Sequence, residues 1–206
     1  EERAFRRFTG DDGLSQLSVS CILQDDRGYL WIGTQAGVNR FDGVRFATFD
    51  TRDGMPNDWI NVLAQAPDGS IWVGTNQGVA EIRRDGSVRD LGLPLDDVTA
   101  IVARADGVWL GTSHGLYRIQ GDRLDKFGPG RGLPPNGVAA LASDADGRLV
   151  VLYRDGTVLR VHSDRAVEPF EHVREDLGIG RGVLVAGDGR VWVARAQGLV
   201  VYRGTR

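Results

Sequence analysis

The stretch YLWIGTQAGVNRFDG at residues 29–43 predicts the fold, because the chain goes on to repeat it. Residues 70–86 read SIWVGTNQGVAEIRRDG, and residues 107–122 read GVWLGTSHGLYRIQGD. Two looser copies follow, RLVVLYRDGTVLRV at 148–161 and RVWVARAQGLVVYRG at 190–204. The chain is therefore built from internal repeats, and the length and content of one repeat indicate the architecture.

The anchor residues of the five copies lie 41, 37, 40 and 43 residues apart; they are Trp31, Trp72, Trp109, Leu149 and Trp192. A period near 40 with short apolar runs and Gly-rich turns is typical of a β-propeller blade. The runs at 30–32 and 71–73 are apolar at successive positions, as expected of strands covered on both faces. We therefore predict an all-β fold, a β-propeller of about five four-stranded antiparallel blades.

Each unit is expected to contain four strands separated by Gly or Asp turns. In the first unit these strands are residues 19–24, 30–34, 38–41 and 44–49. We predict a single propeller domain over residues 1–206, with repeat units at 19–49, 60–91, 98–127, 138–170 and 182–203.

The two ends of the chain complement each other. The fifth unit has three predicted strands and no fourth, whereas residues 4–8 (AFRRF) form a predicted strand without an earlier partner. FRRFTGDDGL at 5–14 also resembles RFATFDTRDGM at 45–55, which contains a fourth strand. We therefore expect residues 4–8 to complete the last blade, so that no long sheet edge stays open. An arc cut from a larger propeller, or a propeller that closes by dimerising, is the alternative.

Composition excludes several classes of function. The net charge of −3 argues against a broad basic surface for nucleic acid. Cys21 is the single cysteine, so neither an intrachain disulfide nor a Cys-based zinc site is expected. No apolar run approaches the roughly 18 residues that a membrane span needs. The first residue is not Met, so we expect that the native start is absent. No cofactor and no metal site are predicted.

The unit resembles the two-component regulator propeller repeat. The resemblance rests on GMPNDWINVLAQAPDGSIWVGTNQGV at 54–79 and on GLSQLSVSCILQDDRGYLWIGTQAGVNRFDG at 13–43. The fourth unit departs from the pattern, because residues 150–154 replace its Trp-Ile-Gly-Thr core. The fifth unit keeps Trp192 but has Ala-Arg where Gly-Thr would stand. The first three units are therefore good matches, and the last two are propeller-like without being close copies.

This resemblance implies a sensing or assembly module of a bacterial signalling protein, located in the periplasm or otherwise outside the cytoplasm. Modules of this family are usually attached to a membrane span and an output domain, and this chain contains neither. The expected partner is an unknown small molecule or protein. A homodimer is a further alternative, and nucleic acid is not an expected partner.

The expected binding site is the end of the blades where the second-to-third-strand loops meet the loops between blades, around the central channel. Trp59 stands out there, because sister units have Ser18, Asp97 or Gly137 at its position. It could stack on a sugar ring or hold a partner chain, or it could simply cover a loop. Asn57 and Asp58 could bind a polyol or serve as turn residues.

Five further residues are candidates for the same site, because they lie in or next to the equivalent loops of the five units. Gln35, Asn76 and His114 lie in second-to-third-strand loops, and His114 replaces an Ala or Gln of the sister loops. Arg154 and Arg195 depart from the Gly-Thr pattern and could mark an anionic ligand, although a salt bridge or plain solvation would explain them equally. No catalytic residue and no metal ligand are assigned.

We therefore predict a non-catalytic sensor propeller that binds a ligand or partner on its loop face. The alternative is a structural or oligomerisation module. A propeller glycoside hydrolase needs paired inward carboxylates, and the acids of this face (Asp58, Asp96, Asp97 and Asp155) all lie in turn-type sequence. A metal-assisted lyase needs convergent histidines, and only His114 is expected on the face.

Overall fold

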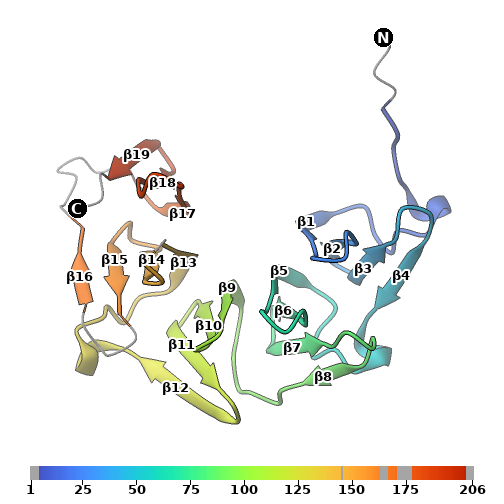
Figure 1. Cartoon of the computed structure of the whole chain (residues 1–206), viewed down its shortest axis with the longest axis horizontal. Helices are drawn as coiled ribbons and strands as arrows, with labels where there is room; N and C mark the ends of the chain where they lie inside the picture. The colour runs from blue at the N-terminus through green and yellow to red at the C-terminus, as the bar shows by residue number, and fades with distance from the viewer. Residues whose placement is uncertain (1–4, 145, 163–166, 171–177, 203–206) are drawn as a thin grey trace. The chain divides into compact units, whose positions relative to one another are not determined.

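The computed structural model describes residues 5–144, 146–162, 167–170 and 178–202. In this part of the chain the strands form five antiparallel sheets, each built from strands that follow one another in sequence (Figure 1). The prediction of an all-β propeller with about five blades is confirmed. No helix of the described residues is long and apolar enough to pass through a membrane.

The chain divides into two compact units, residues 1–97 and residues 98–206, which are described separately. The first unit contains two four-stranded sheets. The first sheet comprises β1 (Val19–Gln24), β2 (Leu30–Thr34), β3 (Gly37–Phe41) and β4 (Phe46–Phe49). The second sheet comprises β5 (Ile60–Gln65), β6 (Ile71–Thr75), β7 (Val79–Ile82) and β8 (Val88–Asp90).

The second unit contains the other three sheets. The third sheet comprises β9 (Val98–Arg104), β10 (Gly107–Thr112), β11 (Gly115–Gln120) and β12 (Arg123–Phe127). The fourth comprises β13 (Val138–Ser143), β14 (Leu149–Tyr153), β15 (Val158–Val161) and β16 (Val167–Pro169). The fifth comprises β17 (Gly180–Val185), β18 (Val191–Arg195) and β19 (Gly198–Tyr202). Short 3-10 helices, η1 (Gly10–Asp12), η2 (Thr51–Asp53) and η3 (Pro129–Arg131), precede the first, second and fourth sheets.

The structure differs from the sequence prediction at the N-terminus. Residues 5–9 contain no strand, and Ala4 lies outside the described residues. The ring of Phe8 packs instead against Phe41 and Phe46 of the first sheet, with ring centroids 5.0 and 5.6 Å away. The sequence pattern of a strand is present in this segment, but among the described residues the segment is not assigned as a strand.

Strand register also corrects one anchor residue. Trp31 in β2 pairs with Leu23 in β1, and the equivalent pair in the fourth sheet is Val150 with Ala142. Val150, not Leu149, therefore occupies the position of the anchor tryptophans. The error arose because two apolar residues in succession leave the register of a buried strand undetermined from sequence.

The core of each unit lies between neighbouring sheets. In the first unit, Trp31 and Val38 of the first sheet pack with Ile60 and Val73 of the second. In the second unit, one cluster joins the third and fourth sheets and another joins the fourth and fifth. Sheets covered on both sides need apolar residues at successive positions, which explains the run of five fully buried residues in β14.

A small residue in the second strand, or in the strand that faces it, allows the next sheet to approach. A Cβ added to Gly33 in β2 would lie 2.8 Å from Ile60 Cγ2, and one added to Gly111 in β10 would lie 2.5 Å from Val138 Cγ1. The fourth sheet has Leu152 at this position, and there the facing residue is Gly180. A Cβ on Gly180 would lie 2.8 Å from Leu152 Cγ. In this pair the large residue is therefore in the second strand and the glycine is in the strand that faces it.

We predict that Gly111→Ala destabilises the protein by about 1–3 kcal/mol, because the new methyl group overpacks against Val138. The free energy of unfolding from urea titration measures this cost. Gly128→Ala is the matched control, since nothing lies within 4 Å of a Cβ at that position. The pair Gly111→Leu and Val138→Gly, which copies Leu152 and Gly180, should cost less than Gly111→Leu alone. Equal costs for Gly111→Ala and the control would contradict this account.

Candidate ligand-binding face

The turn between the second and third strands is closed by the threonine of the Gly-Thr pair. Thr34 Oγ1 donates to the Gly37 carbonyl oxygen at 2.8 Å and accepts from the Ala36 amide at 3.0 Å. Thr75 and Thr112 make the same two kinds of bond in their own sheets, and all three side chains are buried. These threonines therefore shape the loops on which the candidate site was predicted.

The loops between blades bind to these turns through the backbone. In the first unit, the Gly37 amide donates to the Asp58 carbonyl oxygen at 2.8 Å. The Asn76 amide donates to the Trp59 carbonyl oxygen at 3.2 Å, and the Asp97 amide donates to that of Asn76 at 2.8 Å. The predicted residues of the first unit therefore lie at one end of its two sheets, as the sequence indicated.

The side chains of these residues differ in what they do. Trp59 is 46% exposed, and Gln35 is also exposed in its turn. Asn57 Oδ1 accepts from the Trp59 amide at 2.8 Å, so Asn57 acts as a turn residue here. Asp58 accepts from the Thr51 amide at 2.8 Å and from Thr51 Oγ1 at 3.3 Å. Trp59 therefore stands on a loop that three side-chain bonds hold in place.

Asn76 belongs to a small amide and carboxylate cluster. Asn61 Nδ2 donates to Asn76 Oδ1 at 3.0 Å and to Asp97 Oδ1 at 3.2 Å. Among the described residues, Asp97 is the one non-glycine with a positive φ, at 44°. Such a backbone conformation is uncommon outside glycine and is frequent at functional sites. Asn61, which the sequence analysis missed, lies at the β-bulge between Ile60 and Val62.

The second unit holds the remaining three predicted residues. His114 is exposed, and its Nδ1 lies 3.0 Å from Ser113 Oγ. Arg154 is exposed, and its backbone amide donates to the Gly137 carbonyl oxygen at 2.8 Å. The guanidinium of Arg195 donates to the Gly156 carbonyl oxygen at 2.5 Å and thus ties the fifth sheet to a turn of the fourth. This bond accounts for Arg195 as a packing residue, and an anion-binding role for either arginine stays a prediction.

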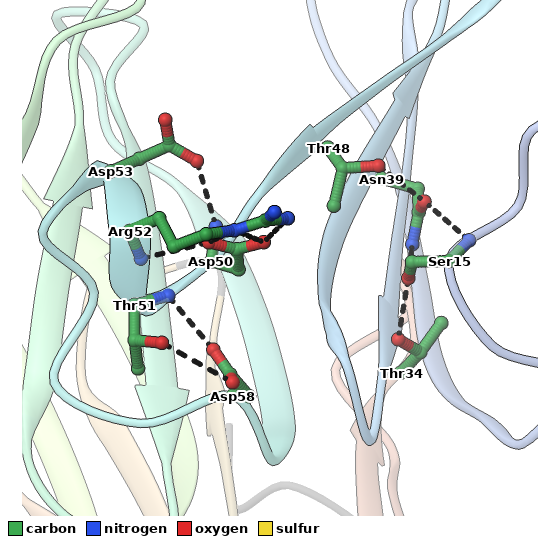
Figure 2. Close-up of polar contacts among 9 residues, drawn as sticks. All are labelled: Ser15, Thr34, Asn39, Thr48, Asp50, Thr51, Arg52, Asp53 and Asp58. Carbon is green, nitrogen blue, oxygen red and sulfur yellow. Dashed lines mark hydrogen bonds and ion pairs between the residues drawn. The ribbon is translucent and has the colours of Figure 1, made fainter.

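A groove of about 520 Å³ opens beside Asp58 in the first unit. It is lined by Ser15, Ala36, Thr48, Asp50, Thr51, Arg52 and Asp58. Figure 2 shows that one wall carries Asp50, Arg52 and Asp58, whereas the other carries Ser15 and Thr48. The lining provides hydroxyl groups, two carboxylates and one guanidinium, which suits a polar ligand.

The first wall of this groove is organised around a buried carboxylate. Asp50 caps η2 by accepting from the Arg52 amide at 2.8 Å, and Arg52 Nε also donates to it at 3.0 Å. The bonds from the Arg52 side chain hold the pKa of Asp50 below its ordinary value. Asp50 is therefore ionised throughout the physiological pH range. Its carboxylate forms an ion pair with Arg52, whose side chain is largely exposed.

The second wall is built on a buried amide that the sequence analysis missed. Asn39 in β3 is fully buried; its Oδ1 accepts from the Ser15 amide at 2.9 Å and its Nδ2 donates to Ser15 Oγ at 2.7 Å. Thr48 Oγ1 donates to Asn39 Oδ1 at 3.2 Å, and Ser15 Oγ lies 3.1 Å from Thr34 Oγ1 (Figure 2). A signal was available, because the residues at this position in the sister sheets are Ala80, Tyr117, Leu159 and Val200.

The second sheet has a groove at the equivalent place, of about 350 Å³. Its lining includes Pro56, Gly92 and Leu93 where the first groove has Ser15, Asp50 and Thr51. The second groove is also polar, through Gln77, Asp90 and Asp96, so both the groove and a polar lining recur with the repeat. What is particular to the first groove is the bonding of Asn39 with Ser15 and of Asp50 with Arg52.

These features define the class of protein, which is a β-propeller whose loop end in the first unit carries an exposed tryptophan beside a polar groove. Two of its repeats, residues 13–36 and 54–77, match the family model described as two component regulator propeller. The matched segments contain the β1, β2, β5 and β6 strands, and of the residues that line the first groove they include Ser15, Ala36 and Asp58.

A curated relative and several solved structures are also similar to this chain. Histidine kinase P4 of Formosa agariphila is 53% identical over 45 residues, which are 22% of this chain and 3% of that protein. The extracellular domain of a hybrid two-component system from B. thetaiotaomicron has a TM-score of 0.80 at 23% identity, over 96% of this chain and 30% of that one. Virginiamycin B lyase from Staphylococcus aureus has a TM-score of 0.75 at 15% identity, over 90% and 70% of the two chains. This chain therefore spans less than a third of the sensor chains that it matches, and at these identities the structural likeness shows the fold.

We predict that Asn39→Ala destabilises the protein by about 1–3 kcal/mol, because the fully buried Asn39 side chain is lost and the Ser15 amide loses its acceptor. Urea unfolding measures the cost. Adding Ser15→Pro should recover part of it, since proline has no amide hydrogen and the second sheet has the pair Pro56 and Ala80 at these positions. A double variant as unstable as the sum of the single variants would contradict the proposed coupling.

Proposed function

We propose that this chain is a non-catalytic sensor propeller of a bacterial signalling protein and that it binds a small molecule or a protein on the loop face. The polar groove beside the exposed Trp59 carries this proposal. Two comparisons support the proposal: the match of two repeats to the two component regulator propeller model, and the structural similarity to extracellular domains of two-component systems.

We take Trp59 and the groove together as one candidate site. Asp58 lines the groove, and Trp59 follows it directly in the chain. A large aromatic face next to hydroxyl and carboxylate groups is suited to a ligand with both an apolar face and polar edges, such as a sugar ring or a peptide aromatic residue. Because Asn57 and Asp58 brace the loop from beneath, Trp59 is presented without a large entropic cost of ordering on binding.

The place of the module in a larger protein follows from its relatives. We infer that it works outside the cytoplasm, as the extracellular domains it resembles do by their description. A membrane-linked output domain would then lie in a part of the protein beyond this chain. In that arrangement the propeller supplies recognition, and the output domain supplies the chemistry.

A structural or oligomerisation module is the second candidate, and one observation favours it. Leu184, Leu199 and Val201 of the fifth sheet are 63%, 61% and 39% exposed. Apolar side chains gathered on one sheet face are typical of interaction surfaces. The lyase that shares the fold bears on the architecture alone, and the proposed module is not an enzyme.

We predict that a ligand of this face raises the melting temperature by about 3–6 °C when it is present at about ten times its Kd, where it contributes roughly 1.4 kcal/mol. A thermal-shift screen with sugars, uronic acids, amino acids, nucleotides and divalent metals measures this. The shift should disappear in Trp59→Ala and weaken in Asp58→Asn, while the melting temperature without ligand changes little because Trp59 is 46% exposed.

Val44→Ala is the matched control for the aromatic variant. Val44 is 77% exposed and lies in the connection between β3 and β4, at the opposite end of the first sheet from the groove. Its ligand-induced shift should equal that of the unmodified chain. A shift that survives Trp59→Ala would place the site elsewhere, and no shift with any compound would favour the structural module.

A further inference from the structure

The hydroxyl groups that line the first groove have given their hydrogens to acceptors within the protein. Asn39 Oδ1 accepts from the Ser15 amide, which fixes the orientation of this side-chain amide. In the 3.2 Å contact of Thr48 Oγ1 with the same oxygen, Thr48 is therefore the donor. Thr51 Oγ1 lies 3.3 Å from a carboxylate oxygen of Asp58, which can only accept. Neither threonine has a hydroxyl hydrogen left for a ligand.

The hydroxyl hydrogen of Ser15 is committed as well. Thr34 Oγ1 donates its one hydrogen to the Gly37 carbonyl oxygen at 2.8 Å, so it is the acceptor in its 3.1 Å contact with Ser15 Oγ. Several backbone amides of the lining are also bonded within the protein, namely those of Ser15, Ala36, Asp50, Thr51 and Arg52. The hydroxyl groups of this groove can therefore offer a ligand lone pairs and no hydrogens.

The charged groups of the lining favour the same kind of ligand. Asp50 and Asp58 contribute two carboxylates and Arg52 contributes one guanidinium, so negative charge is in excess. The N–H groups of Arg52 that are not bonded to Asp50 are the side-chain donors left in the lining. Among the described residues, Asp58 forms no ion pair and takes its side-chain hydrogen bonds from Thr51. Asp58 is therefore the carboxylate with which a charged ligand can still pair.

The lining already holds one cation of its own chain. The side chain of Arg52 is largely exposed, yet its Nε donates to both carboxylate oxygens of Asp50 at 3.0 Å. Guanidinium and ammonium groups donate several hydrogen bonds and accept none, so they match a lining that offers acceptors. A carboxylate or phosphate would bring lone pairs to lone pairs and add negative charge. A sugar hydroxyl is intermediate, because it both donates and accepts.

We propose that the first groove binds a cationic N–H donor, a primary ammonium or a guanidinium group, on the carboxylate of Asp58. The oxygens of Ser15, Thr48 and Thr51 belong to the same lining and serve as further acceptors. This inference rests on the proposed function and names the chemical class of the ligand at that site. A free amine and the lysine side chain of a peptide supply the same group.

Small molecules with the same four-carbon chain test the charge preference on the full chain. They are putrescine, agmatine, butanediol and succinate, titrated by isothermal calorimetry at about pH 7. Putrescine and agmatine should bind about tenfold or more tightly than butanediol, and succinate should not bind. Their binding should weaken as salt is raised, because the pairing is electrostatic and partly exposed. A peptide with one lysine and blocked termini, compared with its norleucine counterpart, shows whether a side chain also supplies the group.

Two substitutions of the lining should move the affinity in opposite directions. Asp58→Asn should weaken putrescine binding about tenfold, because a charge-assisted bond is lost while the shape is kept. Arg52→Gln should tighten it severalfold, because a competing cation is removed, and a merely structural role of Arg52 would not produce a gain. Asp85→Asn is the matched control: Asp85 accepts from the amide and hydroxyl of Ser87 as Asp58 does from those of Thr51, and it lies between β7 and β8. Its Kd should equal that of the unmodified chain.

The alternative outcomes separate this inference from the proposed function. Binding of butanediol or succinate that disappears in Asp58→Asn would keep the function and overturn the ligand class. Putrescine binding that survives Asp58→Asn, or that does not tighten in Arg52→Gln, would overturn the inference. Tighter binding of Ca²⁺ than of putrescine, lost in Asp58→Asn, would assign the groove to a metal ion and would also overturn it. Silence of every probe would do the same, and the thermal-shift screen with Trp59→Ala would then test the function separately.

Discussion

The close approach of each sheet to the first strand of the next is the constraint on which the blade packing in each unit depends. It requires that one of two facing residues be small. Gly33 faces Ile60 and Gly111 faces Val138, so in those pairs the second strand is the small partner. Leu152 faces Gly180, where the order is reversed. A well-packed interior responds to single methyl groups, so this pairing of sizes is a stronger condition than apolar character alone.

The same approach is reinforced by polar bonds that reuse one irregularity of the first strand. Ser20 and Thr99 lie at β-bulges, and their hydroxyl groups donate to the carbonyl oxygens of Ile60 and Val138 in the following sheets. A bulge turns one side chain out of the regular alternation, which is why a strand residue can reach the neighbouring sheet. Packing and hydrogen bonding therefore act at the same junction, and a change in the size of either facing residue would disturb both.

The sequence was sufficient for the fold because its signals are periodic. The tryptophans, the Gly-Thr pairs and the Asp-Gly turns recur, and the predicted limits of β1 and β2 are those of the structure. The units predicted from residues 60 and 138 also begin where β5 and β13 begin. Prediction failed where a decision depended on a partner distant in sequence. Val150 and Leu149 could be told apart only from pairing with Ala142, and the bond of Arg195 to the Gly156 carbonyl group joins two different sheets.

The candidate site illustrates a further limit, because its walls are made by residues whose importance is visible only as a departure from the repeat. Asn39 occupies a position where other sheets have Ala80 or Val200, and burial of an amide is costly unless its bonds are satisfied. Ser15 and Thr48 satisfy them, and both line the groove. The equivalent groove of the second sheet shows that the fold needs none of these polar groups to form a cavity there. A polar network that the architecture does not require, at the end of the sheets where Trp59 is exposed, is more simply explained by recognition than by stability.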